Sequence, residues 1–183
     1  PIHVKLDTGM HRLGFEAEDI PLLIRRLKNQ NAVIPRSVFS HFVGSDSPQF
    51  DAFTRQQIEL FEKGSQELQA AFSHKILRHI CNTAGIERFP GAQFDMVRLG
   101  IGLYGVSPID NSVINNVSTL KTTILQIRDV AAEDTVGYSR KGHLERPSRI
   151  AAIPIGYADG LNRHLGCGHA YCLVNGKKAP YVG

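Results

Sequence analysis

Short apolar runs alternate with longer amphipathic segments through the first hundred residues. Four short runs are typical of buried strands: 2–6, 37–43, 76–80 and 96–100. Helical spacing of apolar residues or helix-terminal charges predict three helices: 16–30, 50–72 and a short one around 84–89. This alternation predicts parallel βαβ units, as in an open α/β sheet or a barrel. A closed eight-fold barrel needs about 250 residues, so we predict half of a (β/α)8 TIM-like barrel.

The pattern changes after residue 107. Residues 108–118 are polar and turn-rich, which is typical of a linker. β-branched runs without long helices follow: 119–127, 149–156 and 171–182. The last run contains Asn175-Gly176, a strong hairpin signal. We therefore predict a partial barrel domain over 1–112 and the start of a mostly β domain over 113–183.

Composition narrows the functional classes. The 183 residues are 42% hydrophobic and 21% charged, which is ordinary for a globular protein, and the formal net charge is +4. Basic and acidic residues are interspersed, with no Lys/Arg run or aromatic ladder, so nucleic acid is not an expected partner. No apolar run approaches the roughly 18 residues of a membrane span, so no membrane partner is expected either.

The cysteines favour a reducing cytoplasm over a disulfide framework. Cys81, Cys167 and Cys172 are odd in number and have no framework spacing. His164 and His169 alternate with two of them, but zinc sites usually pair like ligands at short spacings. We therefore interpret the segment as a glycine-rich loop and expect no metal.

Polar side chains follow the predicted strands. They are Lys5 and Asp7, then His41, then residues 79–83, and finally residues 98–101. Each alone is typical of a structural residue, but ligands of α/β folds meet the carboxyl ends of strands. Four successive polar strand ends predict a site for an anionic, hydrogen-bonding ligand. Arg98 and the following glycines predict a backbone cup for phosphate, with Thr83 nearby.

Seven ordered motifs resemble those of bacterial alanine racemases, which use pyridoxal 5′-phosphate (PLP) to interconvert L- and D-alanine for the peptidoglycan of the cell wall. The motifs are "KLDTGMHRLGF" (5–15), "SHF" (40–42), "CNTAG" (81–85), "FDMVRLGIGLYGVSP" (94–108), "VGYSR" (136–140), "PIGYADGLNR" (154–163) and "GKKAPYVG" (176–183). The resemblance spans the chain and implies a PLP-dependent isomerase.

The resemblance assigns the cofactor-binding residues. Arg98 resembles the arginine that faces the pyridine nitrogen, and Thr83, Gly100 and Ile101 resemble the phosphate cup. An arginine there donates a hydrogen bond and leaves the ring nitrogen unprotonated, which makes the cofactor a weaker electron sink.

Two basic residues of the first motif have further implied roles. Arg12 resembles the arginine that bonds the phenolic oxygen of PLP and helps to hold the substrate carboxylate. Lys5 matches a lysine that is carbamylated in many relatives, a change that would let it pair with Arg12. The alternative is an unmodified lysine with a hydrogen bond nearby.

Tyr138 resembles the catalytic tyrosine that exchanges the α-proton, and His41 resembles the histidine that links this tyrosine to Arg98. A free tyrosine has a pKa of about 10, so the role requires cationic or hydrogen-bonding neighbours. In the family this tyrosine serves the partner subunit's cofactor, which implies a head-to-tail homodimer. Residues at the entrance of the site are also matched: Tyr157, Arg163 and Asp46.

The chain departs from the family pattern in three places. His11 stands where glycine is usual, "VGYS" replaces "VSYG" around Tyr138, and Leu99 stands where proline is frequent. The Schiff-base lysine and two phosphate-binding tyrosines match nothing in 1–183. Together with the abrupt ends of the sequence, this predicts an excised fragment that is inactive by itself.

Two alternatives remain open. The first is a PLP-dependent decarboxylase of basic amino acids on the same barrel; those enzymes place an acid at the pyridine nitrogen, so Arg98 argues against it. The second is a non-enzymatic domain that binds a phosphate ligand or serves as a scaffold.

Overall fold

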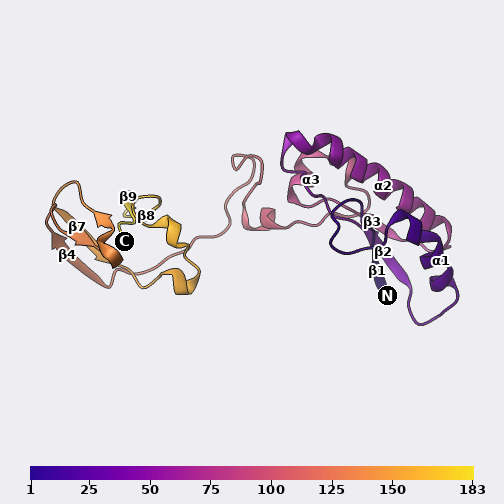
Figure 1. Ribbon diagram of the computed structural model, residues 1–183, viewed down its shortest axis with the longest axis horizontal. Coiled ribbons are helices and arrows are strands. Elements are labelled where there is room, and N and C mark those ends of the chain that lie inside the picture. Colours follow the sequence, from indigo (N-terminus) through magenta and orange to yellow (C-terminus); the bar gives the residue numbers. More distant parts are fainter. The chain divides into compact units, whose positions relative to one another are not determined.

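The chain forms two compact units in the computed structural model, which describes residues 1–183 (Figure 1). Unit 1 comprises Pro1–Thr119 and unit 2 comprises Leu120–Gly183. No helix in either unit has the combination of length and apolarity that crossing a membrane requires.

Unit 1 contains a parallel three-stranded sheet in the order β1-β2-β3. The strands are β1 (Ile2–Lys5), β2 (Pro35–Phe39) and β3 (Leu77–His79). The helices are α1 (Ile20–Lys28), α2 (Asp51–Ala70) and α3 (Thr83–Arg88). Because α1 and α2 each connect two neighbouring parallel strands, unit 1 consists of the predicted βαβ units.

Seven single turns of 3-10 helix complete the helical structure of the two units. They are η1 (Ala17–Asp19), η2 (Pro48–Phe50), η3 (Pro90–Ala92), η4 (Ile101–Tyr104), η5 (Tyr138–Arg140), η6 (Tyr157–Asp159) and η7 (Arg163–Leu165).

The hydrophobic core of unit 1 lies between the sheet and its two connecting helices. Alternation along β1 sends Val4 to the core, where it joins Val38 of β2 and Ile20 of α1. Helix α2, the long helix of unit 1 in Figure 1, contributes Phe61 and Leu68, both fully buried.

The predicted apolar face of residues 50–72 is only partly buried. Phe61 and Leu68 are 0% exposed, but Phe50, Phe53 and Leu60 remain 46%, 37% and 50% exposed. Periodicity identified the helix because it is a local property. It did not identify which turns of the helix meet the sheet, since that depends on the packing of distant strands.

The strand predicted over 96–100 is wrong. This segment runs beside the end of β3 with the backbone bonds Asp95 N–H to Arg78 O (3.1 Å) and Arg98 N–H to Cys81 O (3.0 Å). These bonds are too few to build a ladder, and no further strand pairs with the segment.

Helix α3 is anchored to the loop that follows β2. The side chain of Asn82 caps it by accepting a hydrogen bond from the Gly85 N–H (2.9 Å) and another from the Ser45 hydroxyl (2.9 Å). Arg88, in the last turn, donates to the Ser45 carbonyl (2.9 Å) and pairs with both carboxylate oxygens of Asp51. These contacts fix the loop between β2 and α2.

Unit 2 consists of three antiparallel strand pairs. They are β4 (Gln126–Val130) with β7 (Ser148–Ala152), β5 (Thr135–Val136) with β6 (Gly142–His143), and β8 (Tyr171–Val174) with β9 (Lys177–Pro180). Asn175 and Gly176 join the last pair with φ of 50° and 75°, as a type I′ hairpin requires. The hairpin prediction is confirmed, whereas the strand predicted from residue 119 begins only at Gln126.

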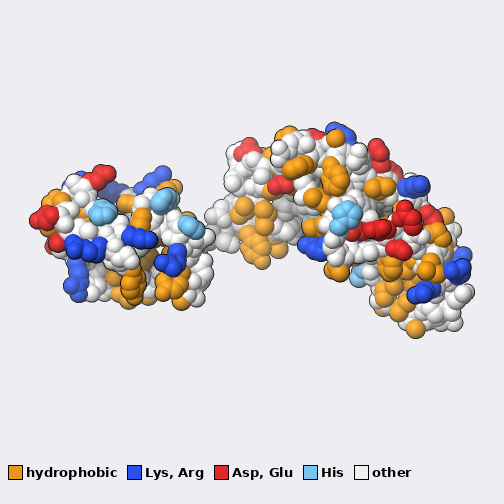
Figure 2. Space-filling model, in the orientation of Figure 1, with side chains coloured by type: hydrophobic (Ala, Val, Ile, Leu, Met, Phe, Trp, Pro, Cys, Tyr) orange, Lys and Arg blue, Asp and Glu red, His pale blue; other side chains and the backbone are white.

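The net charge of the chain resides in unit 2. This unit has 9 Lys and Arg against 5 Asp and Glu, whereas unit 1 has 12 of each. Figure 2 shows basic side chains spread over the visible face of unit 2.

Two leucines of α2 test this description of the core. Leu68→Ala removes a fully buried side chain and should lower the free energy of unfolding by about 2–5 kcal/mol. Leu60→Ala, on the same helix but 50% exposed, should change it by no more than about 0.5 kcal/mol. Urea denaturation measures both, and equal effects would contradict the assigned packing of α2.

Candidate functional site

Two of the side chains predicted at the strand ends of unit 1, those of His41 and His79, meet at Arg98. Its Nη1 lies 2.6 Å from Nδ1 of His79, and its Nη2 lies 3.1 Å from Nδ1 of His41. Three carbonyl oxygens surround the same guanidinium, namely those of Ser40 (2.6 Å), Ile80 (3.2 Å) and His79 (3.3 Å). Arg98 therefore ties together the carboxyl ends of β2 and β3, and only its Nε–H has no partner.

The chemistry of arginine fixes the tautomers of both histidines. A guanidinium only donates hydrogen bonds, so Nδ1 of His41 and Nδ1 of His79 must accept and both rings must be neutral. His79 then donates through Nε2 to the Ser37 hydroxyl (3.1 Å), which leaves that hydroxyl to donate to Nδ1 of His3 (2.6 Å). The result is one directed chain of hydrogen bonds from Arg98 to the first strand.

The environment also favours neutral histidines at this place. Burial, the Arg98 charge and His3 lower the pKa of His79 to about 4. Burial and the positive charges of Arg98, Arg12 and Lys5 lower the pKa of His41. Phe39 stacks on the His79 ring with 5.2 Å between the ring centroids and also lies under the Arg98 guanidinium. Geometry and electrostatics thus agree on the protonation state.

The residues predicted to bind phosphate lie together, and Gly102 joins them. The backbone N–H groups of Gly100 and Gly102 both donate to the Thr83 hydroxyl, at 3.1 and 3.2 Å, whereas the Ile101 N–H has no partner. A Cβ at Gly102 would lie 2.8 Å from Cγ2 of Thr83, so only glycine fits there. Two N–H groups therefore contact a hydroxyl at the start of α3, and the N–H of Ile101 between them is free, an arrangement that suits an anionic group.

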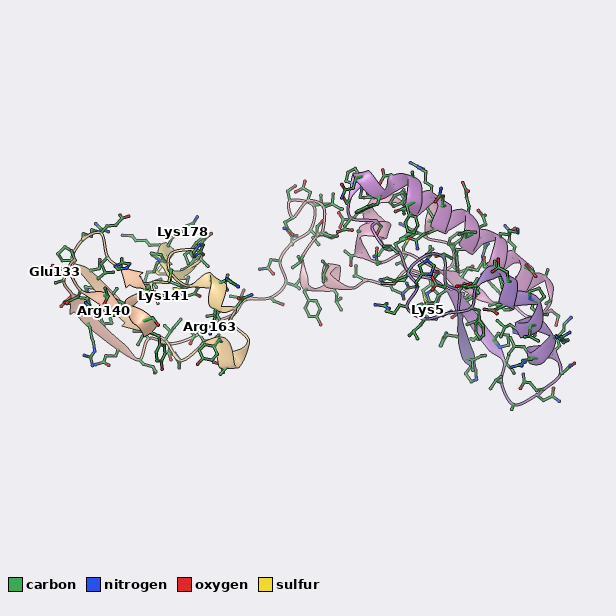
Figure 3. The ribbon with its side chains drawn as sticks, viewed as in Figure 1. Lys5, Glu133, Arg140, Lys141, Arg163 and Lys178 are labelled. Atoms are coloured by element: carbon green, nitrogen blue, oxygen red, sulfur yellow. The ribbon has the colours of Figure 1, made fainter.

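Lys5 and Arg12 lie near His41, as the shift of its pKa indicates, but they do not pair with each other. Figure 3 shows Lys5 in unit 1, and Arg12 is exposed without a hydrogen bond or ion pair. The intervening loop is organised by Asp7, whose Oδ1 accepts from the N–H groups of Gly9, Met10 and His11. Two cations side by side repel each other, so the predicted pairing requires the chemical modification of Lys5.

The remaining predicted residues occupy loops. Asp46 is exposed and follows Ser45, the residue anchored by Arg88. In unit 2, the Arg163 guanidinium lies 5.6 Å from the ring centroid of Tyr157, so these two predicted entrance residues contact each other. Figure 3 labels Arg163 in this unit.

Tyr138 is 90% exposed on an unusual turn of unit 2. Gly137 before it has φ 81° and ψ −173°, a conformation open essentially to glycine alone, and Ser139 after it has φ 56°. The backbone around Tyr138 is therefore strained by on the order of 1 kcal/mol at the serine. His11, the other residue standing where glycine is usual, also has a positive φ of 51°.

Sequence reasoning missed four residues that build the site. Ser37 completes the hydrogen-bond chain, Ser40 supplies a carbonyl to Arg98, Gly102 joins the phosphate cup, and Gln57 of α2 bonds the backbone of His41. Only Gly102 left a local signal, since "GIG" places it one residue beyond the predicted cup. The others act through contacts with residues far away in the sequence.

The low pKa of His79 predicts a pH dependence of stability. The folded state holds His79 neutral down to about pH 4, whereas an unfolded histidine takes up a proton near pH 6.5, so stability is complete above pH 6.5 and falls below it. Between pH 7 and pH 5 this histidine should lower the free energy of unfolding by on the order of 2 kcal/mol.

Urea denaturation at both pH values measures this loss. His79→Gln keeps a side chain that can accept from Arg98 but does not titrate. Between pH 7 and pH 5, the free energy of unfolding of this variant should therefore fall by on the order of 2 kcal/mol less than that of the wild type. An identical loss in the two proteins would show that His79 is not the titrating group.

Comparisons with known families cover both units. Residues 1–108 match the alanine racemase N-terminal domain, and residues 117–183 match the alanine racemase C-terminal domain. Among curated proteins, the chain is 41% identical to an alanine racemase of Aeromonas hydrophila, with 98% of this chain and 50% of that protein covered. It is 39% identical to alanine racemase 2 of Caldanaerobacter subterraneus, with 100% and 48% covered.

Solved structures similar to this chain are alanine racemases as well. The chain superposes on alanine racemase from D-cycloserine-producing Streptomyces lavendulae with a TM-score of 0.85 and 27% identity, covering 100% of this chain and 50% of that one. The biosynthetic alanine racemase from Pseudomonas aeruginosa gives a TM-score of 0.74 at 33% identity, covering 89% and 45%. The chain spans about half the length of the relatives it matches. The predicted fold, half of a (β/α)8 barrel followed by the start of a β domain, is confirmed, and the chain belongs to the alanine racemase family.

Proposed function

We propose that the complete product of this gene is a PLP-dependent isomerase that interconverts L- and D-alanine, and that the Arg98 cluster is its cofactor site. The observation that carries this proposal is the donor-only guanidinium whose Nη atoms are all engaged and whose Nε–H alone remains free. That N–H is available to the pyridine nitrogen of PLP. When bound, PLP supplies an electron sink that makes the α C–H bond of an amino acid acidic.

The surroundings of Arg98 favour a racemase over the decarboxylase alternative. Three backbone carbonyls and two unprotonated ring nitrogens face position 98, and all five are hydrogen-bond acceptors. A carboxylate in the same place would face three carbonyl oxygens that cannot donate to it, which is unfavourable for a half-buried group, and only a change of tautomer in the two histidines would give it donors. These obligate acceptors favour a donor at position 98, and an arginine there would donate to the ring nitrogen without protonating it.

The phosphate of the cofactor would be held at the start of α3. The Ile101 N–H is free, and those of Gly100 and Gly102 are satisfied only by the Thr83 hydroxyl. A phosphate oxygen there can accept from the Ile101 N–H and from the hydroxyl together. This part of the site also suits the second alternative, a phosphate-binding domain without activity.

His41 and Tyr138 would move the proton. Because Nδ1 of His41 accepts from Arg98, its ring proton resides on Nε2 and can be donated to the phenolic oxygen of a tyrosine. Such a bond favours the phenolate, which is the form that takes the α-proton of the substrate. We propose that this tyrosine is Tyr138 of the partner subunit in a head-to-tail homodimer.

Arg12 would hold the substrate carboxylate, for which its exposed and unpaired guanidinium is suited. Carbamylation of Lys5 would replace a positive charge near Arg12 by a negative one and so orient Arg12. We place Tyr157, Arg163 and Asp46 at the entrance, where the contact between Arg163 and Tyr157 would restrict access to small amino acids.

We also propose that the two units are the two domains expected from the sequence. The compact units divide at Thr119, and the family matches leave residues 109–116 between them, close to the boundary expected at 112. A cytoplasmic location is proposed on the basis of three free cysteines, of which Cys81 is buried and has its pKa raised by burial to about 11.

The test is an assay of the complete gene product. With added PLP and L-alanine it should form D-alanine until the two enantiomers are equal in concentration. Absence of D-alanine would refute racemisation, and release of CO2 from lysine or ornithine instead would support the decarboxylase alternative.

Tyr138→Phe tests the proposed proton transfer. It removes the phenolic oxygen, so removal of the α-proton from one enantiomer should slow by about 10²- to 10⁴-fold, while the opposite enantiomer still loses its proton to the other base. Exchange of the α-proton in D2O, measured separately for L- and D-alanine, gives both rates.

Tyr171→Phe is the matched control, since it makes the same change on strand β8 of unit 2 outside the proposed site. It should leave both exchange rates unchanged. An equal loss for both enantiomers in Tyr138→Phe, accompanied by a lower melting temperature, would indicate a purely structural role for Tyr138.

A further inference from the structure

Gln57 is a buried polar side chain, which is unfavourable unless each of its donors and acceptors has a hydrogen-bond partner. It lies on the inner face of α2 and is 0% exposed. Its carboxamide nitrogen donates to the His41 carbonyl (3.1 Å) and to the Thr8 hydroxyl (3.2 Å), and its oxygen accepts from the Val43 N–H (3.0 Å). All of these partners lie in the loops that follow β1 and β2.

The orientation of this carboxamide follows from its partners. A backbone carbonyl can only accept and a backbone N–H can only donate, so a flipped amide would place oxygen against oxygen and N–H against N–H. Both hydrogens of the Gln57 amide nitrogen are used. No residue of similar size offers two donors and one acceptor in this arrangement except glutamine.

The contacts of Gln57 imitate a neighbouring strand. In a parallel ladder one residue bonds the carbonyl of residue i and the N–H of residue i+2 on the adjacent strand. Gln57 makes the same pair of bonds with His41 and Val43. The pairing of β2 with β3 ends at Phe39, so the Gln57 amide continues the support of this chain beyond the end of the sheet.

This support acts on the segment that faces Arg98. The carbonyl of Ser40 and Nδ1 of His41 both contact Nη2 of the guanidinium, at 2.6 and 3.1 Å. The Thr8 hydroxyl that accepts from Gln57 also contacts the Ser40 hydroxyl (2.7 Å), which connects the loop after β1 to the same segment. One buried side chain thus joins two strand-end loops directly behind the site.

We propose that Gln57 is a positioning residue of the cofactor site, which holds the backbone of residues 41–43 in place so that the His41 ring meets Arg98. The expected effect of Gln57 on catalysis rests on the proposed function. The positioning itself is a property of the protein without cofactor.

A second glutamine of α2 provides a matched control. Gln69 donates to the His74 carbonyl (3.0 Å) and accepts from the Ile76 N–H (2.8 Å), which is the same strand-like pair of bonds. It supports the segment that enters β3, at the end of the sheet opposite Arg98. Gln69→Leu and Gln57→Leu therefore remove equivalent interactions from one helix, and only the second lies behind His41.

The first measurement is the NMR titration of the His41 ring in the complete gene product without PLP, with its signal assigned by its loss in His41→Gln. Burial and Arg98 hold the pKa of His41 below 6.5 in the wild type. In Gln57→Leu the ring should leave Arg98 and its pKa should rise toward about 6.5. In Gln69→Leu the titration should stay at the wild-type value, although the melting temperature falls.

The second measurement uses Gln57→Glu, which preserves the shape of the side chain if Gln57→Leu does not fold. A protonated carboxyl still accepts from Val43 and donates to His41, whereas a carboxylate repels the His41 carbonyl. The kcat of Gln57→Glu relative to the wild type should be reduced by about 10- to 100-fold at high pH and recover as the pH falls.

Two results would overturn the proposal. One is an unchanged His41 titration in Gln57→Leu, or an equal shift in Gln69→Leu. The other is a ratio of kcat values for Gln57→Glu that does not depend on pH. If the wild-type protein forms no D-alanine, the proposed function fails, and the His41 titration of the variants still decides the role of Gln57.

Discussion

The guanidinium of Arg98 requires acceptors, and the architecture of unit 1 supplies them. A charged group in a half-buried position is tolerated only when its donors are paired. Parallel strands that end at one edge present their last carbonyls there, which is how Ser40, His79 and Ile80 come to surround Arg98. The site therefore follows from the sheet: if the sheet slipped by one residue, the carbonyls that satisfy this charge would point elsewhere.

The helices contribute to the site as well as to the core. Helix α2 buries Phe61 and Leu68 against the sheet and, on the same inner face, carries Gln57 to the loops behind His41. Helix α3 begins at Thr83, so the hydroxyl of its first turn lies beside the backbone of Gly100 and Gly102. Packing forces that stabilise the fold thus place the polar groups of the site, because both depend on the same helix positions.

Two of the six non-glycine residues with a positive φ stand where the resemblance leads us to expect glycine. His11 and Ser139 both keep a left-handed conformation, with φ of 51° and 56°. Asp7 compensates at the first position, since its carboxylate accepts from the His11 N–H. At the second, Ser139 follows Tyr138, and the conformation of this turn determines how the phenol projects.

The sequence by itself determined the local structure and the chemical groups of this protein. Periodicity predicted the helix over 50–72, and the charges at its ends predicted the helix over 16–30. Asn175-Gly176 predicted its hairpin, and the ordered motifs identified the family, because these signals reside in neighbouring residues. Only the tertiary structure decided that 96–100 is not a strand, which face of α2 is buried, and that Gln57 and Ser37 support the site. Those outcomes depend on packing between distant segments and on hydrogen bonds between residues up to 49 positions apart, which no local pattern encodes.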